Sequence, residues 1–188
     1  IRRVFRHNDR ILAMFPMVVK LSRWPEGGVA VERGPLVYSL GVPEDWRIDR
    51  RDPRSTPRMP AYNLYPAGRW NWALDVDERS LARAIRVEHR AMPSNPWTLE
   101  GAPLRLHAPA RSVRGWRLVR KRAVPDGYSW KNATTYDREF VFTPALPPVD
   151  RLRERLGDRL ESIALVPYGC THLRLTVFPD ARRAGRRA

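Results

Sequence analysis

Apolar residues recur at every second position in several parts of this chain, and this period of two constrains the fold more than any other feature. Val29 and Val31 show the pattern, and Leu36, Tyr38 and Leu40 repeat it after a Gly-Pro break. Alternate side chains of an extended strand share one face, so each run predicts a half-buried strand. The Gly-Pro break predicts a bulge or a sheet edge, because proline cannot donate a hydrogen bond to a strand ladder.

Other runs with the same period predict further strands, and these runs are Leu104–Leu106, Trp116–Leu118, Phe140–Phe142 and His172–Phe178. Ile163–Pro167 is the expected hairpin partner of the last run, with Tyr168–Thr171 as the turn. Short strands between turns rich in proline and glycine are typical of a β-sandwich or a β-barrel. We predict an all-β fold, an antiparallel β-sandwich with at most one or two short helices.

One segment has helical spacing instead. Asp150 is a candidate N-cap, and Leu152, Leu156 and Leu160 follow it at roughly helical intervals. Gly157 weakens this helix by about 1 kcal/mol relative to alanine. We expect a short amphipathic helix that packs on the sheet.

The chain length of 188 residues suffices for one medium domain or two small ones. We expect residues 1–179 to form the β-sandwich region, either as one unit or as two sub-sandwiches dividing near 76–95. Residues 180–188 are expected to form a disordered, arginine-rich tail. The longest apolar run, Ile11–Val19, is about half a membrane span and contains Pro16, so no membrane span is predicted. Because the chain begins at Ile1 without an initiator methionine, we interpret it as a piece of a longer protein, with its localisation left open.

The charge balance is strongly basic, with a net charge of +15 from 35 basic and 20 acidic residues. A balance of this kind is typical of proteins that bind polyanions. The only lysines, however, are Lys20, Lys121 and Lys131, and the arginines are scattered along the chain apart from the tail. Solvated surface charge is therefore the favoured interpretation, a polyanion-binding domain is the weaker alternative, and nucleic acid is not a favoured partner.

Cys170 is the single cysteine, so neither an internal disulfide nor a cysteine-based metal cluster can form within this chain. A nucleophilic thiol needs an adjacent base. His172 is two residues away, but positions i and i+2 of an extended segment share a face without any fixed hydrogen-bond geometry. We expect Cys170 to be a buried thiol without a catalytic role.

The densest acidic groups are Glu44-Asp45 and the set Asp75, Asp77 and Glu78. Two carboxyl groups about 5 to 9 Å apart could serve glycoside hydrolysis. Both groups follow strands in turn-rich context, where acids commonly solvate the chain. The four histidines show no metal-ligand spacing. The sequence therefore predicts no catalytic residue, no metal ligand and no cofactor in this chain.

Seven tryptophans are the other candidates for a binding role. Trp70 and Trp72 would present two indole rings on one face if that segment were extended. Flat aromatic rings can stack on sugars, so Trp70 and Trp72 are the candidate carbohydrate contacts. The alternative is that these large rings fill the core or a domain interface.

Three stretches, taken in order, resemble one family. They are Val29–Leu40 (VAVERGPLVYSL), Trp70–Leu74 (WNWAL) and Leu165–Pro179 (LVPYGCTHLRLTVFP). They are similar to a strand, a downstream block and the closing hairpin of the β-L-arabinofuranosidase family, glycoside hydrolase family 127 and its relatives. Their order and spacing agree from about residue 11 to residue 179.

The resemblance implies that this chain is the C-terminal β-sandwich region of a larger, bacterial enzyme. In that family an (α/α)6 helical barrel precedes this region and carries a zinc-bound cysteine nucleophile. The nucleophile is not carried over to Cys170, which lies in the closing hairpin. The expected function is a non-catalytic accessory region that supports the absent barrel, with that barrel as its partner and plant-type arabinosyl saccharides as possible ligands. The alternative is an autonomous carbohydrate-binding module.

Overall fold

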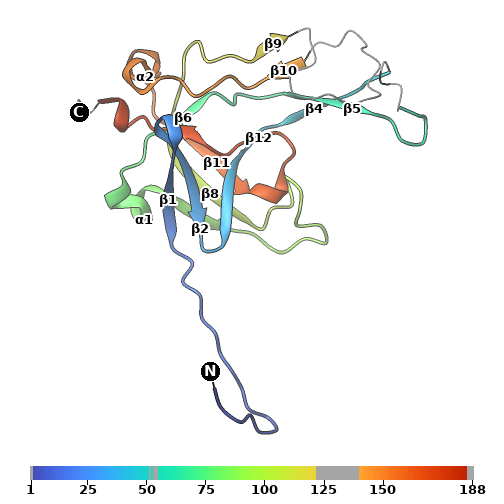
Figure 1. The fold of residues 1–188 in the computed structure, drawn as a ribbon, viewed down its shortest axis with the longest axis vertical. Coiled ribbons are helices and arrows are strands. Elements are labelled where there is room, and N and C mark those ends of the chain that lie inside the picture. Colours follow the sequence, from blue (N-terminus) through green and yellow to red (C-terminus); the bar gives the residue numbers. More distant parts are fainter. Residues whose placement is uncertain (1, 51, 53–54, 122–139, 186–188) are drawn as a thin grey trace.

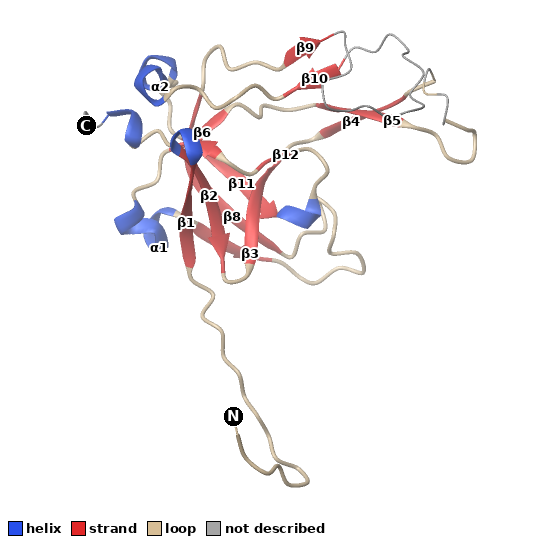
Figure 2. Ribbon diagram, in the orientation of Figure 1, coloured by secondary structure: helices blue, strands red, loops and turns tan. Residues whose placement is uncertain are grey.

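The computed structural model describes residues 2–50, 52, 55–121 and 140–185. Strands make up most of its regular structure, and only short helices accompany them (Figures 1 and 2). The strands form one large sheet and two small two-stranded sheets. Within the described residues, no helix is both long enough and apolar enough to cross a membrane.

The main sheet has nine strands, six of which follow one path of hydrogen-bonded neighbours. In that order they are β1 (Val19–Trp24), β2 (Gly28–Arg33), β3 (Leu36–Gly41), β11 (Glu161–Pro167), β8 (Leu104–Ser112) and β6 (Trp72–Leu74). Each of these neighbours is antiparallel to the next. β8 is nine residues long. It is therefore long enough to pair with β6 near one end and with β7 (Arg86–His89) toward the other.

The Gly-Pro break between the first two predicted strands is a tight turn rather than a bulge. β2 and β3 form a hairpin in which Arg33 pairs with Leu36, leaving two residues in the loop. Gly34 has a φ of 58°, a conformation that glycine adopts without steric cost. A glycine of positive φ at the first loop position is a feature of type II′ hairpin turns.

The last strands fill a gap between β2 and β3, which pair directly only near their turn. β12 (Arg174–Leu175) pairs with β3, and β13 (Phe178–Pro179) pairs with β2. The predicted hairpin between 163–167 and 172–178 is therefore wrong. Leu40 of β3 pairs with Leu165 on one side and with Leu175 on the other, so β3 separates the two segments.

The sheet then curls onto itself. Asp180 forms a parallel bridge to Leu74 of β6, and the Ala181 N–H donates a 2.9 Å hydrogen bond to the Leu74 carbonyl. This contact joins β6, at the end of the path, to the segment that follows β13. The fold is all-β with a curled antiparallel sheet and two short helices among the described residues, so the predicted fold class is confirmed.

The core lies inside this curl. Tyr38, Leu74, Leu106, Leu165 and Phe178 are among its largest fully buried side chains and come from five different strands. Full burial of such a side chain contributes about 1.5 to 3 kcal/mol relative to leaving it in water. The core thus holds together strands that are far apart in the sequence.

The two small sheets extend from one end of the main sheet (Figure 2). β4 (Glu44–Ile48) pairs with β5 (Tyr62–Pro66), and β9 (Val119–Lys121) pairs with β10 (Phe140–Phe142). The predicted strand at 140–142 is present. The one predicted at 116–118 is displaced, because Trp116 lies outside any strand and β9 begins at Val119.

Both helices are short: α1 spans Leu81–Ala84 and α2 spans Val149–Arg155. α2 is the predicted helix, but it begins one residue before Asp150 and ends before Gly157. Pro148 occupies its N-cap position, and Asp150 lies in the first turn. Leu152 is fully buried, so the helix packs on the sheet through this side chain.

The described part of the predicted tail, residues 180–185, lies against the sheet. Asp180 is buried, and its carboxylate accepts hydrogen bonds from the N–H groups of Arg182 and Arg183. A short 3-10 turn, Arg183–Gly185, follows. Residues 186–188 lie outside the described residues. β6, before the predicted division near 76–95, and β7, within that range, both pair with β8, and the division stays a prediction.

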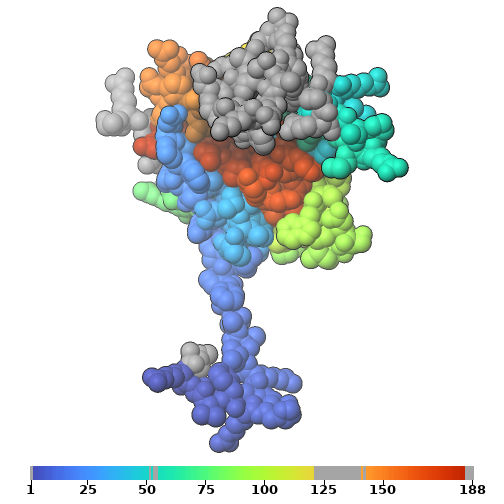
Figure 3. All heavy atoms as spheres, turned by 45° about the vertical axis from the view of Figure 1, so that its right-hand side comes forward, coloured from blue at the N-terminus to red at the C-terminus, as the bar shows by residue number. Residues whose placement is uncertain are grey.

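The N-terminal arm, residues 2–18, leaves the body of the molecule (Figures 1 and 3). Asp9 accepts hydrogen bonds from the Arg6 N–H and the Arg3 guanidinium, which closes a turn at the far end of the arm. The arm meets the body at the β2–β3 turn, where the Gly34 N–H donates to the Val18 carbonyl and the Met17 sulfur lies beside Gly34.

Candidate functional site

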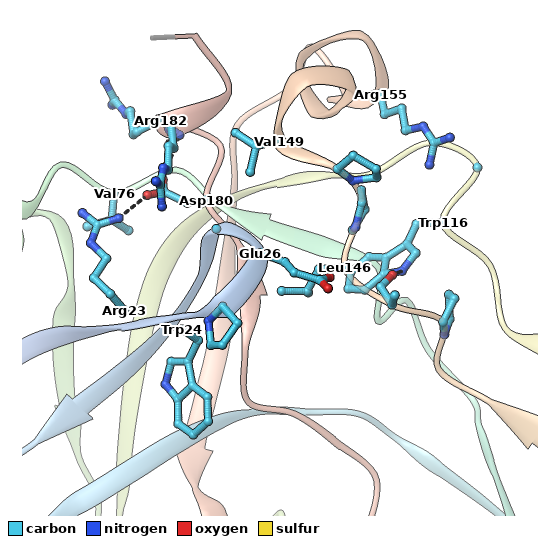
Figure 4. A pocket seen from close by; sticks show the side chains of 18 of the residues that line it. Arg23, Trp24, Glu26, Val76, Trp116, Leu146, Val149, Arg155, Asp180 and Arg182 are labelled. Carbon is cyan, nitrogen blue, oxygen red and sulfur yellow. Dashed lines mark hydrogen bonds and ion pairs between the residues drawn. The ribbon is translucent and has the colours of Figure 1, made fainter. Parts of the chain in front are cut away.

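A wide groove of about 2040 Å³ opens on the described structure. Its walls include the turn after β1, the segment 76–79 after β6, the segment 115–119, the segment that leads into α2, and residues 180–183. Val76, Trp116 and Leu146 supply buried or half-buried apolar surface along it. Figure 4 shows Glu26 and Leu146 near its middle, between Trp24 and Trp116.

An ion-pair network borders one side of the groove. Arg23 of β1 bonds to Asp180 at 2.7 Å and to Glu78 at 2.6 Å (the first of these is drawn in Figure 4). The hydrogen bonds that Arg23 donates, first to Glu78 and then to Asp180, raise the pKa of Arg23 above its ordinary value. Arg23 is therefore a permanent cation that ties β1 to the C-terminal segment.

Asp75 and Asp77, two of the acidic residues singled out in the sequence, form ion pairs or hydrogen bonds within the fold. Asp75 is buried between Arg111, at 2.7 Å, and Arg182. The Asp77 carboxylate caps the following 3-10 turn by accepting from the Arg79 N–H. These carboxylates hold the groove wall together and are not paired with each other across a space for substrate.

Trp70 and Trp72, the predicted sugar contacts, do not lie in one extended strand, and both pack on the core. Trp72 is only 6% exposed and belongs to the core, with its indole N–H bonded to the Arg69 carbonyl. Trp70 lies before β6 begins, and its ring packs on Trp116 with 4.9 Å between the ring centroids. Trp70 also lines a small cavity of about 110 Å³ together with Tyr65.

Cys170 is a buried thiol in the 3-10 turn Tyr168–Cys170. Its sulfur lies 3.3 Å from the Pro96 carbonyl, to which it donates. Burial raises the pKa of the thiol, which disfavours the reactive thiolate at neutral pH. His172 is directed elsewhere, because its Nδ1 lies 3.1 Å from the Glu44 carboxylate.

The Glu44 carboxylate links β4 to the segment that follows β11 through hydrogen bonds. It accepts from the backbone N–H groups of His172 and Leu173, at 2.8 and 2.9 Å, and from the indole N–H of Trp46 at 3.0 Å. Burial raises the pKa of Glu44, but the hydrogen bonds from Leu173 and His172 outweigh it and leave the pKa lowered. The sequence marked Glu44 only as part of an acidic pair, since its partners lie more than 120 positions away.

Among the residues that the structure describes, no group of three or more His, Cys, Asp and Glu side chains is placed to hold a metal ion. The groove residues Trp24 and Glu26 were not predicted. They belong to a Trp-Pro-Glu-Gly turn between β1 and β2, and turn composition predicts exposure without indicating a ligand.

No family model, curated protein or solved structure matches this chain. The resemblance to the β-L-arabinofuranosidase family therefore rests on the three sequence stretches. Their positions in the fold are β2 with β3, the start of β6, and β11 through β13.

Proposed function

We propose that this chain is the non-catalytic C-terminal β-region of a larger glycoside-hydrolase-like protein. Its role is to support a helical catalytic barrel elsewhere in the same polypeptide. The three family-like stretches support this proposal because all of them contribute to the main sheet rather than to an acid–base pair. The observation that carries it furthest is the N-terminal arm.

The arm exposes eight large apolar side chains. They range from 40% to 87% exposed and are Val4, Phe5, Ile11, Leu12, Met14, Phe15, Met17 and Val18. Soluble monomers rarely expose contiguous apolar surface beyond a few hundred Å², and larger patches mark interaction sites. The exposed apolar side chains of the arm therefore indicate a contact with another protein surface. We propose that this surface belongs to the catalytic part of the same polypeptide.

The first test measures the association state of the 188-residue chain. We expect the chain to self-associate at high concentration and low salt in multi-angle light scattering, despite its charge. The double change Leu12→Ser with Phe15→Ser should shift it toward monomer without lowering the thermal midpoint, because both side chains are largely exposed on the arm. Leu160→Ser is the matched control, since Leu160 is exposed outside the arm. A clean monomer for the unchanged chain would count against the proposal.

The second test asks what covers the arm. Trypsin should cleave the 188-residue chain rapidly after Arg6 or Arg10, which are exposed on the arm. In a longer polypeptide that includes the sequence encoded upstream, the same bonds should be cleaved much more slowly. Equal cleavage rates in the two proteins would show that the upstream part does not cover the arm.

A further inference from the structure

Four arginine side chains lining the groove have no hydrogen-bond or ion-pair partner in the described part of the chain. They are Arg79, Arg117, Arg155 and Arg183. They come from four separate parts of the chain, so the fold gathers them around one hollow. Unpaired guanidinium groups favour an anionic ligand, because carboxylates can accept two parallel N–H bonds from one arginine.

Trp24 adds an open aromatic face. It is 51% exposed, and it pairs in the β1–β2 ladder with Gly28, which has no side chain to cover the ring. Its indole N–H bonds to the Ser22 hydroxyl at 3.3 Å, which restrains the ring. In Figure 4 the ring stands clear of the other side chains drawn.

Glu26 occupies a left-handed backbone conformation, with φ 56° and ψ 27°. A non-glycine residue pays roughly 1 to 2 kcal/mol there, and such strain clusters at ligand sites. Its exposed carboxylate lies beside Leu146 in the groove and has no partner among the residues described. A free carboxylate in a basic groove can accept hydrogen bonds from hydroxyl groups.

These three features together match one ligand chemistry. A uronate ring carries a carboxylate for arginine, hydroxyl groups for Glu26 and a C–H face for an indole. A nucleic acid matches less well, because its closely spaced phosphates would lie near Glu26 and Glu78 and offer these carboxylates no backbone donor. We propose that the groove between β1 and α2 binds an acidic, uronate-containing oligosaccharide.

The test is isothermal titration of the 188-residue chain with trigalacturonate, with neutral arabinotriose and a short single-stranded oligonucleotide as comparison probes. We expect binding of trigalacturonate and at least about tenfold weaker binding of arabinotriose, since one charge-assisted hydrogen bond is worth about a factor of ten. Tighter binding of the oligonucleotide, with a steep salt dependence, would replace the proposal by a polyanion site. Preferred binding of arabinotriose, or no binding of any probe, would overturn it.

Variants locate the site. Arg117→Gln and Trp24→Ala should each weaken trigalacturonate binding by about tenfold. The matched controls are Arg159→Gln and Trp97→Ala, which change exposed residues outside the groove and should bind as the unchanged chain does. Thermal midpoints check that all four variants fold. Equal losses in the controls would place binding elsewhere. This outcome is separate from the accessory role, which depends on the arm.

Discussion

At the residue scale, the spacing of Trp70 and Trp72 predicted two rings on one face of a strand, but the two residues do not belong to one strand. Trp70 and Trp72 would share a face only in a continuous strand, and β6 begins at Trp72. Trp72 consequently enters the core while Trp70 packs on Trp116. Cys170 is buried, as expected from the sequence for a thiol with no base placed beside it. Backbone direction at a strand boundary is set by tertiary contacts, which spacing does not contain.

Glu44 carries a pH-dependent part of the stability. Its side chain is 12% exposed, and its carboxylate is held by backbone N–H groups in the folded chain. Because its pKa is lower folded than unfolded, its contribution is full above the ordinary value of 4.5 and is lost as the pH falls below it. Glu44→Gln should lower the free energy of unfolding at pH 7 by about 1.5 to 3 kcal/mol.

Urea unfolding at pH 7 and at pH 3 measures this effect. The difference between the unchanged chain and Glu44→Gln should shrink at the lower pH, because Glu44 loses its charge as the pH falls through its lowered pKa. Asp45→Asn is the neighbouring control, since Asp45 bonds only to the exposed Arg47 among the described residues. A difference that stayed constant with pH would assign the loss to packing rather than to the charge.

At the element scale, the period of two located β2, β3, β11 and the closing strands, yet it assigned a wrong partner to β11. A periodic pattern reports that one face is buried and says nothing of which strand lies alongside. The insertion of β12 and β13 between β2 and β3 depends on contacts more than 130 positions apart. β4 and β5 were not predicted, because no residue of either strand is fully buried and neither strand has a clearly apolar face.

Phe178 should be the position where this insertion matters most. It is fully buried and pairs with Val29, so it anchors β13 in the gap beside β2. Phe178→Ala should destabilise the fold by about 3 to 5 kcal/mol, through lost burial and a cavity. Tyr168→Ala, an exposed aromatic change in the same C-terminal region, should cost much less. Chemical denaturation measures the loss of unfolding free energy in both variants. Equal losses would mean that β13 does not anchor the sheet.

At the scale of the whole molecule, the period of two indicated an all-β protein and the charge balance a basic surface, but the placement of charge came only with the fold. The arginines that looked scattered in sequence include Arg23 and Arg111, which, together with Arg182 of the tail, tie distant segments together through Asp75, Glu78 and Asp180. Other arginines line the groove with no side-chain partner among the described residues. Long-range topology, which decides between these two roles, is not encoded in local spacing.

The partners of the acidic side chains and of the thiol lead to an expectation about activity. Glycoside hydrolysis needs an acid and a nucleophile or base in fixed geometry. Asp75 and Glu78 are engaged with arginines, and the Cys170 thiol is buried with a raised pKa. The 188-residue chain should therefore show no hydrolysis of an aryl arabinofuranoside above buffer, with or without added zinc.

Cys170→Ser separates a structural thiol from a catalytic one. The thiol donates to the Pro96 carbonyl from a buried position, and a serine hydroxyl can make the same bond at a small cost in packing. The expected result is a loss of at most about 1 to 3 kcal/mol in unfolding free energy, with no change in an activity that is already absent. Turnover by the unchanged chain that Cys170→Ser abolished would require a nucleophile at this turn. The accessory role would then give way to a catalytic one, because the thiol would have to leave its carbonyl partner and reach substrate.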